Sequence, residues 1–316
     1  MTTRFIQGLD NVDDALRGGV VTIGNFDGVH RGHQLILQTA RALGDAGGVP
    51  VVAVTFDPPP DVVLRRDDAL RRLTPHHVKC ELLGGCGADA VVTAQPAAEL
   101  LEMRADEFVT QVVVAMFAPA HVVEGQNFRF GRDRAGGAEL LARAGRRHGF
   151  DVQVVEPVMA EIDGRPVRIS STRIRGLIAA GRIAQANRCL GRSFALYGRV
   201  MPGSGHGRLL QFPTANIAPV EQVVPPDGVY AGAAEVAGDR FAAAVSIGHK
   251  PTLGPSRQRH VEAFLIDAEG DYYDQELSLE LFARLRDQRR FDSTEELSAQ
   301  IARDVDRVRQ RYEQRV

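Results

Sequence analysis

The chain has 316 residues, 44% of them hydrophobic, and its 38 basic side chains nearly balance 40 acidic ones for a net charge of −2. This length accommodates about two domains of ordinary size, each with its own core. The balanced charge excludes the broad basic field that nucleic-acid-binding proteins use, so we expect no nucleic-acid partner.

The cysteine pattern and the apolar stretches bear on the cellular compartment of the protein. Cys80, Cys86 and Cys189 make an odd count without a CxxC pair, which argues against a disulfide framework or a structural zinc and suits a reducing cytoplasm. The first residues lack the pattern of a signal peptide, and the most apolar window, residues 109–123, is interrupted by polar residues and a proline. We therefore expect a cytoplasmic protein with no membrane partner, while its oligomeric state stays open.

The first half of the chain alternates between short β-rich runs and helical patterns. The candidate strands are Val20–Ile23, Val51–Phe56, Ala90–Thr93, His121–Val123 and Val152–Val155, and the candidate helices are Gln34–Leu43, Val78–Leu83, Ala105–Phe117 and Ala138–His148. Such alternation predicts an α/β fold, a doubly wound parallel sheet with helices on both faces. Ligands of such sheets bind at the carboxyl ends of the strands.

A glycine-rich loop follows the first predicted strand and ends where a helix begins. Gly24, Gly28 and Gly32 allow close approach of a ligand to the backbone, and the free N–H groups of a helix start favour an anion. His30 and His33 lie at this helix start, where each can donate a hydrogen bond to a phosphate chain. The HxGH pattern alone is a weak signal, because a histidine near a helix start is often only a cap.

A second hydroxyl-rich turn, Ile169–Arg175, leads into a helix predicted near Gly176–Ala180. The hydroxyls of Ser171 and Thr172 can hold a phosphate, and Arg175 can neutralise it. Two phosphate-binding helix starts on one sheet indicate a nucleoside triphosphate. Arg173 is more simply explained as a solvated side chain.

Beyond a short helix at Ile183–Leu190, the helical pattern gives way to β-runs without intervening helices. These runs are Ala195–Val200, Val229–Val236, Phe241–Ile247, Val261–Ile266 and Leu277–Leu285. They predict an antiparallel barrel or sandwich. The change of pattern places the domain boundary near residues 186–192, giving domains 1–188 and 189–316. A capping box at Ser293–Glu296 opens a C-terminal helix that we expect to pack on the barrel.

The start of this second domain carries a glycine-rich run and the motif FPTAN. Gly203, Gly205 and Gly207 with Arg208 could cradle phosphates, although such a run is often a mere turn. In the motif, Thr214 and Asn216 are two residues apart in a predicted strand and point to one side. Their oxygen atoms suit Mg²⁺.

Glu262 stands in an otherwise apolar strand, VEAFLI. A carboxylate there needs either solvent on the alternate face of the strand or a function, and alternation alone leaves the solvent-exposed interpretation open. The functional interpretation is a general base.

Taken together, GNFDGVHRGH, GQNFRFG at Gly125–Gly131 and ISSTRIR resemble the adenylyltransferase half of the bacterial bifunctional riboflavin kinase/FAD synthetase family. FPTAN, GVYA, SIG and VEA resemble its riboflavin kinase signature. The resemblance implies an HxGH-type nucleotidyltransferase domain in which the FMN phosphate attacks the α-phosphorus of ATP. It also implies a six-stranded barrel with a C-terminal helix that transfers the γ-phosphoryl group of ATP to riboflavin.

The same resemblance implies roles for individual residues. His30 and His33 would stabilise charge on the phosphates, Glu262 would be the base, and Thr214 with Asn216 would hold Mg²⁺. The implied nucleotide- or flavin-binding residues are Gly24, Phe26, Gly28, Asn127, Arg168, Ser171, Thr172, Arg175, Gly203, Gly205, Gly207 and Arg208. Asn127 with Gly131 can also be read as a simple turn, and Phe128 and Phe130 as core residues.

Two departures from the family pattern fall on the flavin side of the adenylyltransferase half. Pro59 replaces a histidine, and residues 94–98 lack the expected Phe-Asp pair. Three hypotheses follow: an enzyme that makes FMN and then FAD, a riboflavin kinase whose adenylyltransferase half is weak or inactive, and a non-catalytic flavin- or nucleotide-binding module. The first is favoured because the proposed base, both magnesium ligands and both histidines occur together.

Overall fold

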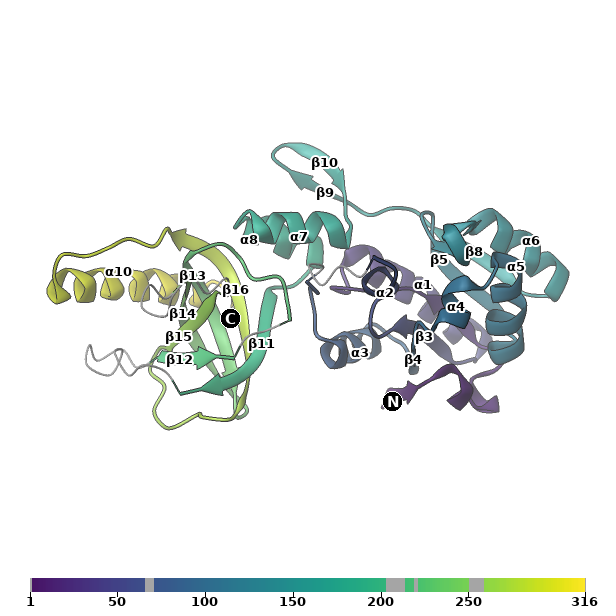
Figure 1. Cartoon of the computed structure of the whole chain (residues 1–316), viewed down its shortest axis with the longest axis horizontal. Coiled ribbons are helices and arrows are strands. Elements are labelled where there is room, and N and C mark those ends of the chain that lie inside the picture. Colours follow the sequence, from purple (N-terminus) through teal and green to yellow (C-terminus); the bar gives the residue numbers. More distant parts are fainter. Residues whose placement is uncertain (1, 66–70, 203–213, 219–220, 250–258, 316) are drawn as a thin grey trace. The chain divides into compact units, whose positions relative to one another are not determined.

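The computed structural model describes residues 2–65, 71–202, 214–218, 221–249 and 259–315. The chain divides into two compact units (Figure 1). The first, the sheet unit, comprises Met1–Arg71 and His76–Ser170, and the second, the barrel unit, comprises Arg72–Pro75 and Ser171–Val316.

Six parallel strands form the sheet of the first unit. Their order is β1 (Arg4–Gln7), β4 (Ala90–Ala94), β3 (Val51–Phe56), β2 (Val20–Ile23), β5 (His121–Gly125) and β8 (Asp151–Val155). The predicted parallel sheet is therefore confirmed, and each of the five predicted strands is present. The sequence did not indicate β1, an edge strand in which only Ile6 is buried.

Helices cover both faces of this sheet, because successive residues of its strands alternate between two hydrophobic clusters. Val20, Val51 and Val91 face one cluster, to which α1 (Arg31–Gly47) and α3 (His76–Gly85) contribute. The residues that follow them in each strand face the other cluster, formed with α5 (Ala105–Phe108), η3 (Val109–Phe117) and α6 (Ala138–His148). The predicted helix at 105–117 thus continues as a π-helix after Phe108.

Shorter elements complete the sheet unit. They are α2 (Pro60–Arg65), α4 (Ala98–Glu102), the two-stranded pairs β6 (Arg129–Phe130) with β7 (Gly136–Gly137) and β9 (Met159–Ile162) with β10 (Arg165–Arg168), and the 3-10 turns η1 (Leu9–Asn11), η2 (Asp14–Leu16) and η4 (Arg132–Arg134).

A closed barrel of antiparallel strands forms the second unit, as the pattern of β-runs predicted. Its order is β11 (Phe194–Met201), β12 (Thr214–Ile217), β15 (His260–Leu265), β14 (Asp239–Gly248), β13 (Gly228–Val236) and β16 (Glu276–Arg286). Helices α7 (Ser171–Ala179) and α8 (Ile183–Leu190) precede it. The prediction placed α7 too late, near Gly176. The helix begins at Ser171 because Ile174, Leu177 and Ile178 form its buried face.

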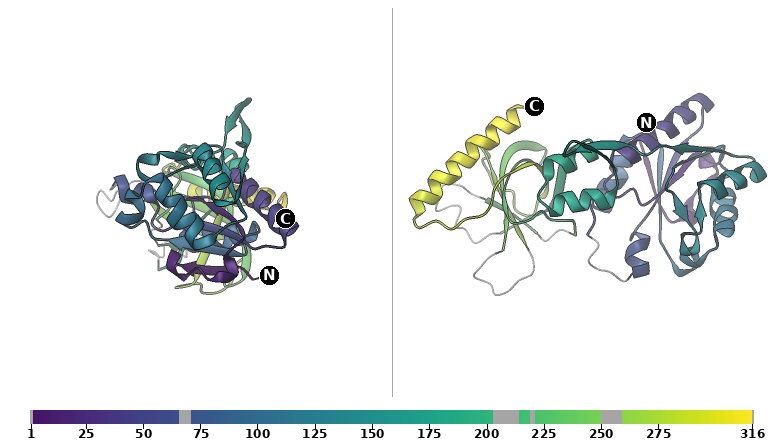
Figure 2. Two further views of the ribbon diagram at one scale, coloured as in Figure 1. Left: turned by 90° about the vertical axis from the view of Figure 1, so that its right-hand side faces the viewer. Right: turned by 90° about the horizontal axis from the view of Figure 1, so that it is seen from above.

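The C-terminal helix α10 (Thr294–Glu313) packs on the barrel, as expected (Figure 2). The Ser293 side chain caps it by accepting a hydrogen bond from the Glu296 N–H at 3.2 Å. Val308 of α10 joins Ala242 and Ile266 in a buried cluster against which Phe264 also packs.

One buried amide holds the segment 72–75 within the barrel unit. The Gln222 side chain accepts from the Tyr197 N–H at 2.8 Å and donates to the carbonyls of Ala195 at 2.9 Å and Leu73 at 3.0 Å. Gln222 is 2% exposed, so all three bonds are shielded from water. A piece of chain that lies between two parts of the sheet unit in sequence is thereby fixed to β11.

Candidate active sites

The loop after β2 places both predicted histidines at the start of α1. Nδ1 of His30 accepts a hydrogen bond from the His33 N–H at 3.4 Å, so His30 caps the helix. This bond requires a lone pair on Nδ1, which leaves Nε2 as the protonated nitrogen of a neutral His30 ring. The two imidazole rings are stacked, with centroids 3.6 Å apart. Two ring donors are therefore held together at a helix N-terminus, as an anion site requires.

The His33 ring has one enclosed nitrogen and lies against Phe26. Nδ1 of His33 is enclosed and has no hydrogen-bond partner within the described residues, and the ring packs edge-on against Phe26 at 5.2 Å. Burial, then the neighbouring His30, then Lys79 lower the pKa of His33 well below its usual value. The ring is thus neutral at pH 7 and gains a proton readily only when an anion compensates the charge.

The backbone of this loop has unusual dihedral angles. Gly28 has φ 83°, while Phe26 and Val29 reach 47° and 36° although they carry side chains. A side chain at Gly24 would place its Cβ 3.1 Å from the Phe26 ring. The loop therefore needs glycine at the first two predicted positions, and the geometry brings Gly24, Phe26 and Gly28 together with the histidines.

Sequence reasoning missed two buried side chains that contact this loop. The Ile23 N–H donates to Oε1 of Glu124 at 2.6 Å, and Nζ of Lys79 donates to the Asn25 and Phe56 carbonyls at 3.2 and 3.0 Å. Burial raises the pKa of Glu124 well above its usual value, although the Ile23 N–H acts in the opposite direction. A charged residue type inside an apolar strand or a buried helix face was the available signal for both.

The Gly125–Gly131 motif divides between core and surface. Phe130 is buried and contacts Phe108, with ring centroids 5.5 Å apart, and Phe128 stacks on Phe130 at 5.2 Å. The core interpretation of Phe130 is thus confirmed. Asn127 is exposed, in a turn that the Phe128 N–H closes on the Gly125 carbonyl at 2.9 Å.

The remaining predicted residues of the adenylyltransferase half fall in different units. Arg168 ends β10 of the sheet unit, whereas Ser171, Thr172 and Arg175 lie in the first turns of α7, within the barrel unit. Their participation with His30 in one nucleotide site stays a prediction.

On the barrel, the predicted base and one predicted metal ligand are direct neighbours across strands. Asn216 of β12 is opposite Glu262 of β15, and Glu262 is opposite Ser246 of β14. Directly paired residues point to the same face, with Cβ atoms roughly 4.5–5.5 Å apart. Thr214 belongs to this face by alternation. Glu262 is half-buried on it, whereas Val261 and Ala263 are buried on the other face, so this alternation is compatible with both the solvent-facing and the general-base interpretations.

These residues suit a hard cation. A hydroxyl, an amide oxygen and a carboxylate on one face fit the oxygen preference of Mg²⁺. In the described part of the chain, no three His, Cys, Asp or Glu side chains gather as metal ligands, so Mg²⁺ would depend on these oxygens and on the phosphates. Gly203, Gly205, Gly207 and Arg208 lie outside the described residues, and their role stays a prediction.

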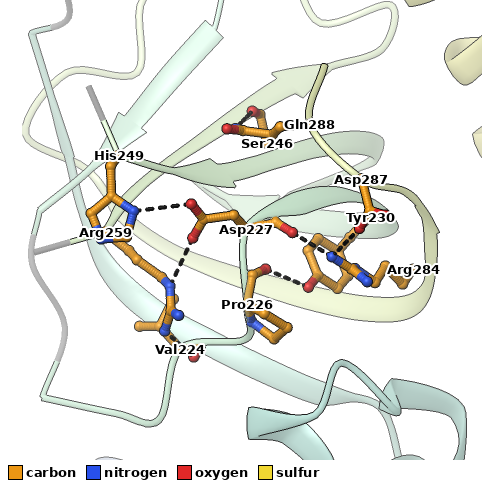
Figure 3. Close-up of polar contacts among 10 residues, drawn as sticks. All are labelled: Val224, Pro226, Asp227, Tyr230, Ser246, His249, Arg259, Arg284, Asp287 and Gln288. Carbon is orange, nitrogen blue, oxygen red and sulfur yellow. Dashed lines mark hydrogen bonds and ion pairs between the residues drawn. The ribbon is translucent and has the colours of Figure 1, made fainter. Parts of the chain in front are cut away.

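A network of charged residues around Asp227 joins several strands of the barrel (Figure 3). Asp227 accepts from Nε of Arg259 at 2.9 Å and lies 3.0 Å from Nδ1 of His249. Burial raises the pKa of the Asp227 carboxyl, but the hydrogen bonds from His249 and Arg259 outweigh burial and lower it. The Asp227 carbonyl accepts from Arg284. The network therefore holds the ends of β13, β14, β15 and β16 together beside Ser246 and Glu262.

Comparison with known proteins assigns the two halves separately. A model of the FAD synthetase family matches residues 12–173, and a model of the riboflavin kinase family matches residues 190–312. Two similar proteins are described as bifunctional riboflavin kinase/FMN adenylyltransferase. The one from Pseudomonas fluorescens is 37% identical to this chain over 96% of both chains, and the one from Escherichia coli K12 is 37% identical over 95% of both chains.

A solved structure extends the likeness over both units. A protein from Streptococcus pneumoniae described as a macrolide-efflux protein matches with a TM-score of 0.86 and 26% identity, over 98% of this chain and 99% of that one. The term efflux describes the Streptococcus pneumoniae protein and is not applied to the present chain. Among the described residues of the present chain, no helix has both the length and the apolar character needed to span a bilayer.

Proposed function

We propose that each half of the chain catalyses one of two successive reactions. The chain belongs to the bifunctional riboflavin kinase/FMN adenylyltransferase family. The second half phosphorylates riboflavin to FMN with ATP, and the first adenylylates FMN to FAD with release of pyrophosphate. The catalytic domains in this proposal are residues 1–188 and 189–316. The observation that supports it best is that each family model covers the half that contains the matching arrangement of side chains.

In the adenylyltransferase half, an FMN phosphate oxygen attacks the α-phosphorus of ATP and the bond to pyrophosphate breaks. His30 and His33, stacked at the start of α1, donate to phosphate oxygens as negative charge develops. The N-terminus of α1 and the N–H groups of the loop add positive potential. Asn127, Arg168, Ser171, Thr172 and Arg175 bind the nucleotide or the flavin in this proposal.

In the kinase half, Glu262 takes the proton of the riboflavin 5′-hydroxyl. The hydroxyl oxygen then attacks the γ-phosphorus of a second ATP, and the bond from this phosphorus to the β-phosphate oxygen breaks, releasing ADP. Thr214 and Asn216 would hold Mg²⁺, which supplies charge neutralisation to the phosphates when bound. The cross-strand pairing of Asn216 with Glu262 supports this assignment because it brings the base and a metal ligand to one face. In this proposal the phosphates are bound by Gly203, Gly205, Gly207 and Arg208.

A cytoplasmic location is part of the proposal. It is supported by Cys80, Cys86 and Cys189, which lie in the described part of the chain and form no disulfide there. Both reactions consume ATP, which is available in the cytoplasm.

One experiment tests the proposed function. Purified protein is incubated with riboflavin and ATP, with and without Mg²⁺, and the flavins are separated by chromatography. We expect FMN and then FAD, both dependent on Mg²⁺. FMN that accumulates without FAD would instead identify a riboflavin kinase with an inactive adenylyltransferase half, and unchanged riboflavin would contradict both activities.

A further inference from the structure

Two buried ionisable side chains hold the backbone on either side of Gly24. Glu124, 2% exposed, accepts from the Ile23 N–H at 2.6 Å. Lys79, 4% exposed, donates to the Asn25 carbonyl at 3.2 Å and to the Phe56 carbonyl at 3.0 Å. The two side chains come from different elements, β5 and α3, and none of the sequence motifs contains both.

Glu124 lies where neighbouring strands separate. Strand β2 pairs with β5 only at Val20 and Val21, whereas β5 stays paired with β8 as far as Gly125. The Ile23 N–H therefore has no main-chain acceptor on β5, and the Glu124 carboxyl supplies one. In a doubly wound sheet, the gap between diverging strands at their carboxyl ends is the place where the ligand binds.

Lys79 fixes the direction of one peptide group. Its ammonium and the Thr55 hydroxyl, at 3.3 Å, both donate to the Asn25 carbonyl. Because a trans peptide is planar, the Phe26 N–H of the same group points the opposite way, away from Lys79. That N–H is thus presented for an anion to bind.

The loop needs such restraints because its backbone is strained. Phe26 and Val29 have positive φ angles of 47° and 36°. Such a backbone conformation is unfavourable for a residue that carries a side chain and persists only where its surroundings enforce it. Without the contacts of Lys79 and Glu124, the loop would relax toward ordinary dihedral angles. Its N–H groups would then no longer point toward a bound anion.

The choice of residue at position 79 fits this role. Among the 38 basic residues the chain has only two lysines, Lys79 and Lys250, and otherwise uses arginine. A compact ammonium with three donors can bind two carbonyls in a closed space, which a planar guanidinium does poorly. The ammonium also lies near enough to the His33 ring to contribute to its lowered pKa, after burial and His30.

We propose that Lys79 and Glu124 are positioning residues for adenylyl transfer, which hold the Asn25 carbonyl and the Ile23 N–H so that the loop N–H groups and both histidines face the ATP phosphates. The inference rests on the adenylyltransferase function proposed above. Neither side chain contacts the substrate. Glu124 acts as a neutral hydrogen-bond partner, because an ionised carboxylate beneath the phosphates would repel them.

The test compares Lys79→Met and Glu124→Leu with Glu124→Gln, which keeps an acceptor, and with Glu81→Met as a matched control on the exposed side of α3. FAD formation from added FMN is measured for each. The first two variants should lower kcat about 10–100-fold, the usual cost of misplaced reacting groups. The KM for ATP should change less than kcat, because the positioned donors act mainly on charge that develops in the transition state. Glu124→Gln should restore most of kcat.

Two structural readouts accompany the kinetics. All five tyrosines lie in the barrel unit and the chain has no tryptophan, so tyrosine fluorescence and FMN formation report that this unit stays folded. Hydrogen exchange should become faster at residues 24–29 in the first two variants and return to normal in Glu124→Gln. This exchange result does not depend on catalysis, so it separates failure of the inference from absence of adenylyltransferase activity in the unmodified protein.

Unaltered kcat in Lys79→Met and Glu124→Leu would overturn the inference, and so would a Glu124→Gln variant as impaired as Glu124→Leu. If Lys79→Met loosens the whole sheet in the exchange experiment, Lys79→Gln, which keeps a donor for one carbonyl, replaces it. Its kcat should then fall between that of the unmodified protein and that of Glu124→Leu, and unmodified kcat would contradict the proposal.

Discussion

The interpretation of Glu262 depends on its neighbours across the strands of the barrel. In an apolar strand its carboxylate could serve solubility alone, but its pairing with Asn216 and Ser246 surrounds it with oxygen-bearing side chains on one half-buried face. The proposed mechanism places the general base beside a metal ligand, because in phosphoryl transfer the hydroxyl must lose its proton where the phosphate is held.

We predict that Glu262→Ala abolishes FMN formation from riboflavin and leaves FAD formation from added FMN intact. Loss of a general base lowers kcat by roughly 10²–10⁴-fold. The matched control is Glu276→Ala, an exposed glutamate of β16. Chromatography of the flavins after incubation with each substrate measures both activities, and loss of both activities in Glu262→Ala would contradict the two-site description.

Glu124 leads to a prediction about pH and stability. Its folded pKa is raised above the unfolded value, so between these values the folded state holds a proton that the unfolded state has released. The free energy of unfolding contributed by this group therefore falls as pH rises above about 4.5, by up to about 1.4 kcal/mol per pH unit. Glu124→Gln removes this dependence.

Hydrogen exchange of the sheet strands, corrected for intrinsic rates, measures this effect between pH 5 and 8. Protection in Glu124→Gln should exceed that of the unmodified protein by a margin that grows with pH. A margin that is constant or shrinks would show that Glu124 is ionised in the folded state.

Single residues were predictable where a motif has chemistry of its own. His30 and His33 were singled out because their motif follows a predicted strand, opens a predicted helix and is accompanied by a second hydroxyl-rich helix start. Lys79 and Glu124 were missed because their partners are main-chain atoms of residues distant in sequence. No local pattern encodes such a contact, which depends on how α3 and β5 pack against the loop.

At the scale of elements, buried strands were the easiest to predict. Val20–Ile23 and Val51–Phe56 match the structure to the residue, because a strand covered on both faces is a continuous apolar run bounded by turn residues. Edge and surface elements lack this signature. In strand β1 and in the β9–β10 pair, at most every second residue is buried. Their sequences therefore lack a continuous apolar run and resemble those of loops.

Gln222 gives an element-scale prediction. Its amide makes three buried hydrogen bonds that fix segment 72–75 and β11, and Gln222→Leu removes all three. The expected loss is about 3 kcal/mol of the unfolding free energy of the barrel unit. Urea denaturation followed by tyrosine fluorescence reports this unit alone. Gln310→Leu, an exposed glutamine of α10, is the control, and equal midpoints for the two variants would contradict the role of Gln222.

The whole molecule joins two reactions whose chemistry needs different scaffolds. A parallel sheet presents strand ends and helix starts to the phosphates of a nucleotide, whereas a closed barrel presents a row of side chains on one face across adjacent strands. FMN is the product of one scaffold and the substrate of the other. If the scaffolds act separately, each can be inactivated without affecting the other.

The reciprocal of the Glu262 experiment tests this separation. We predict that His30→Ala combined with His33→Ala reduces FAD formation at least about 10²-fold, because the donors to the developing phosphate charge are lost. FMN formation from riboflavin should continue, so FMN accumulates. His148→Ala, at an exposed histidine of α6 in the same unit, serves as the control and should make FAD normally. Undiminished FAD formation in the double variant would remove both histidines from the mechanism, and a parallel loss of FMN formation would show that the two units depend on one another.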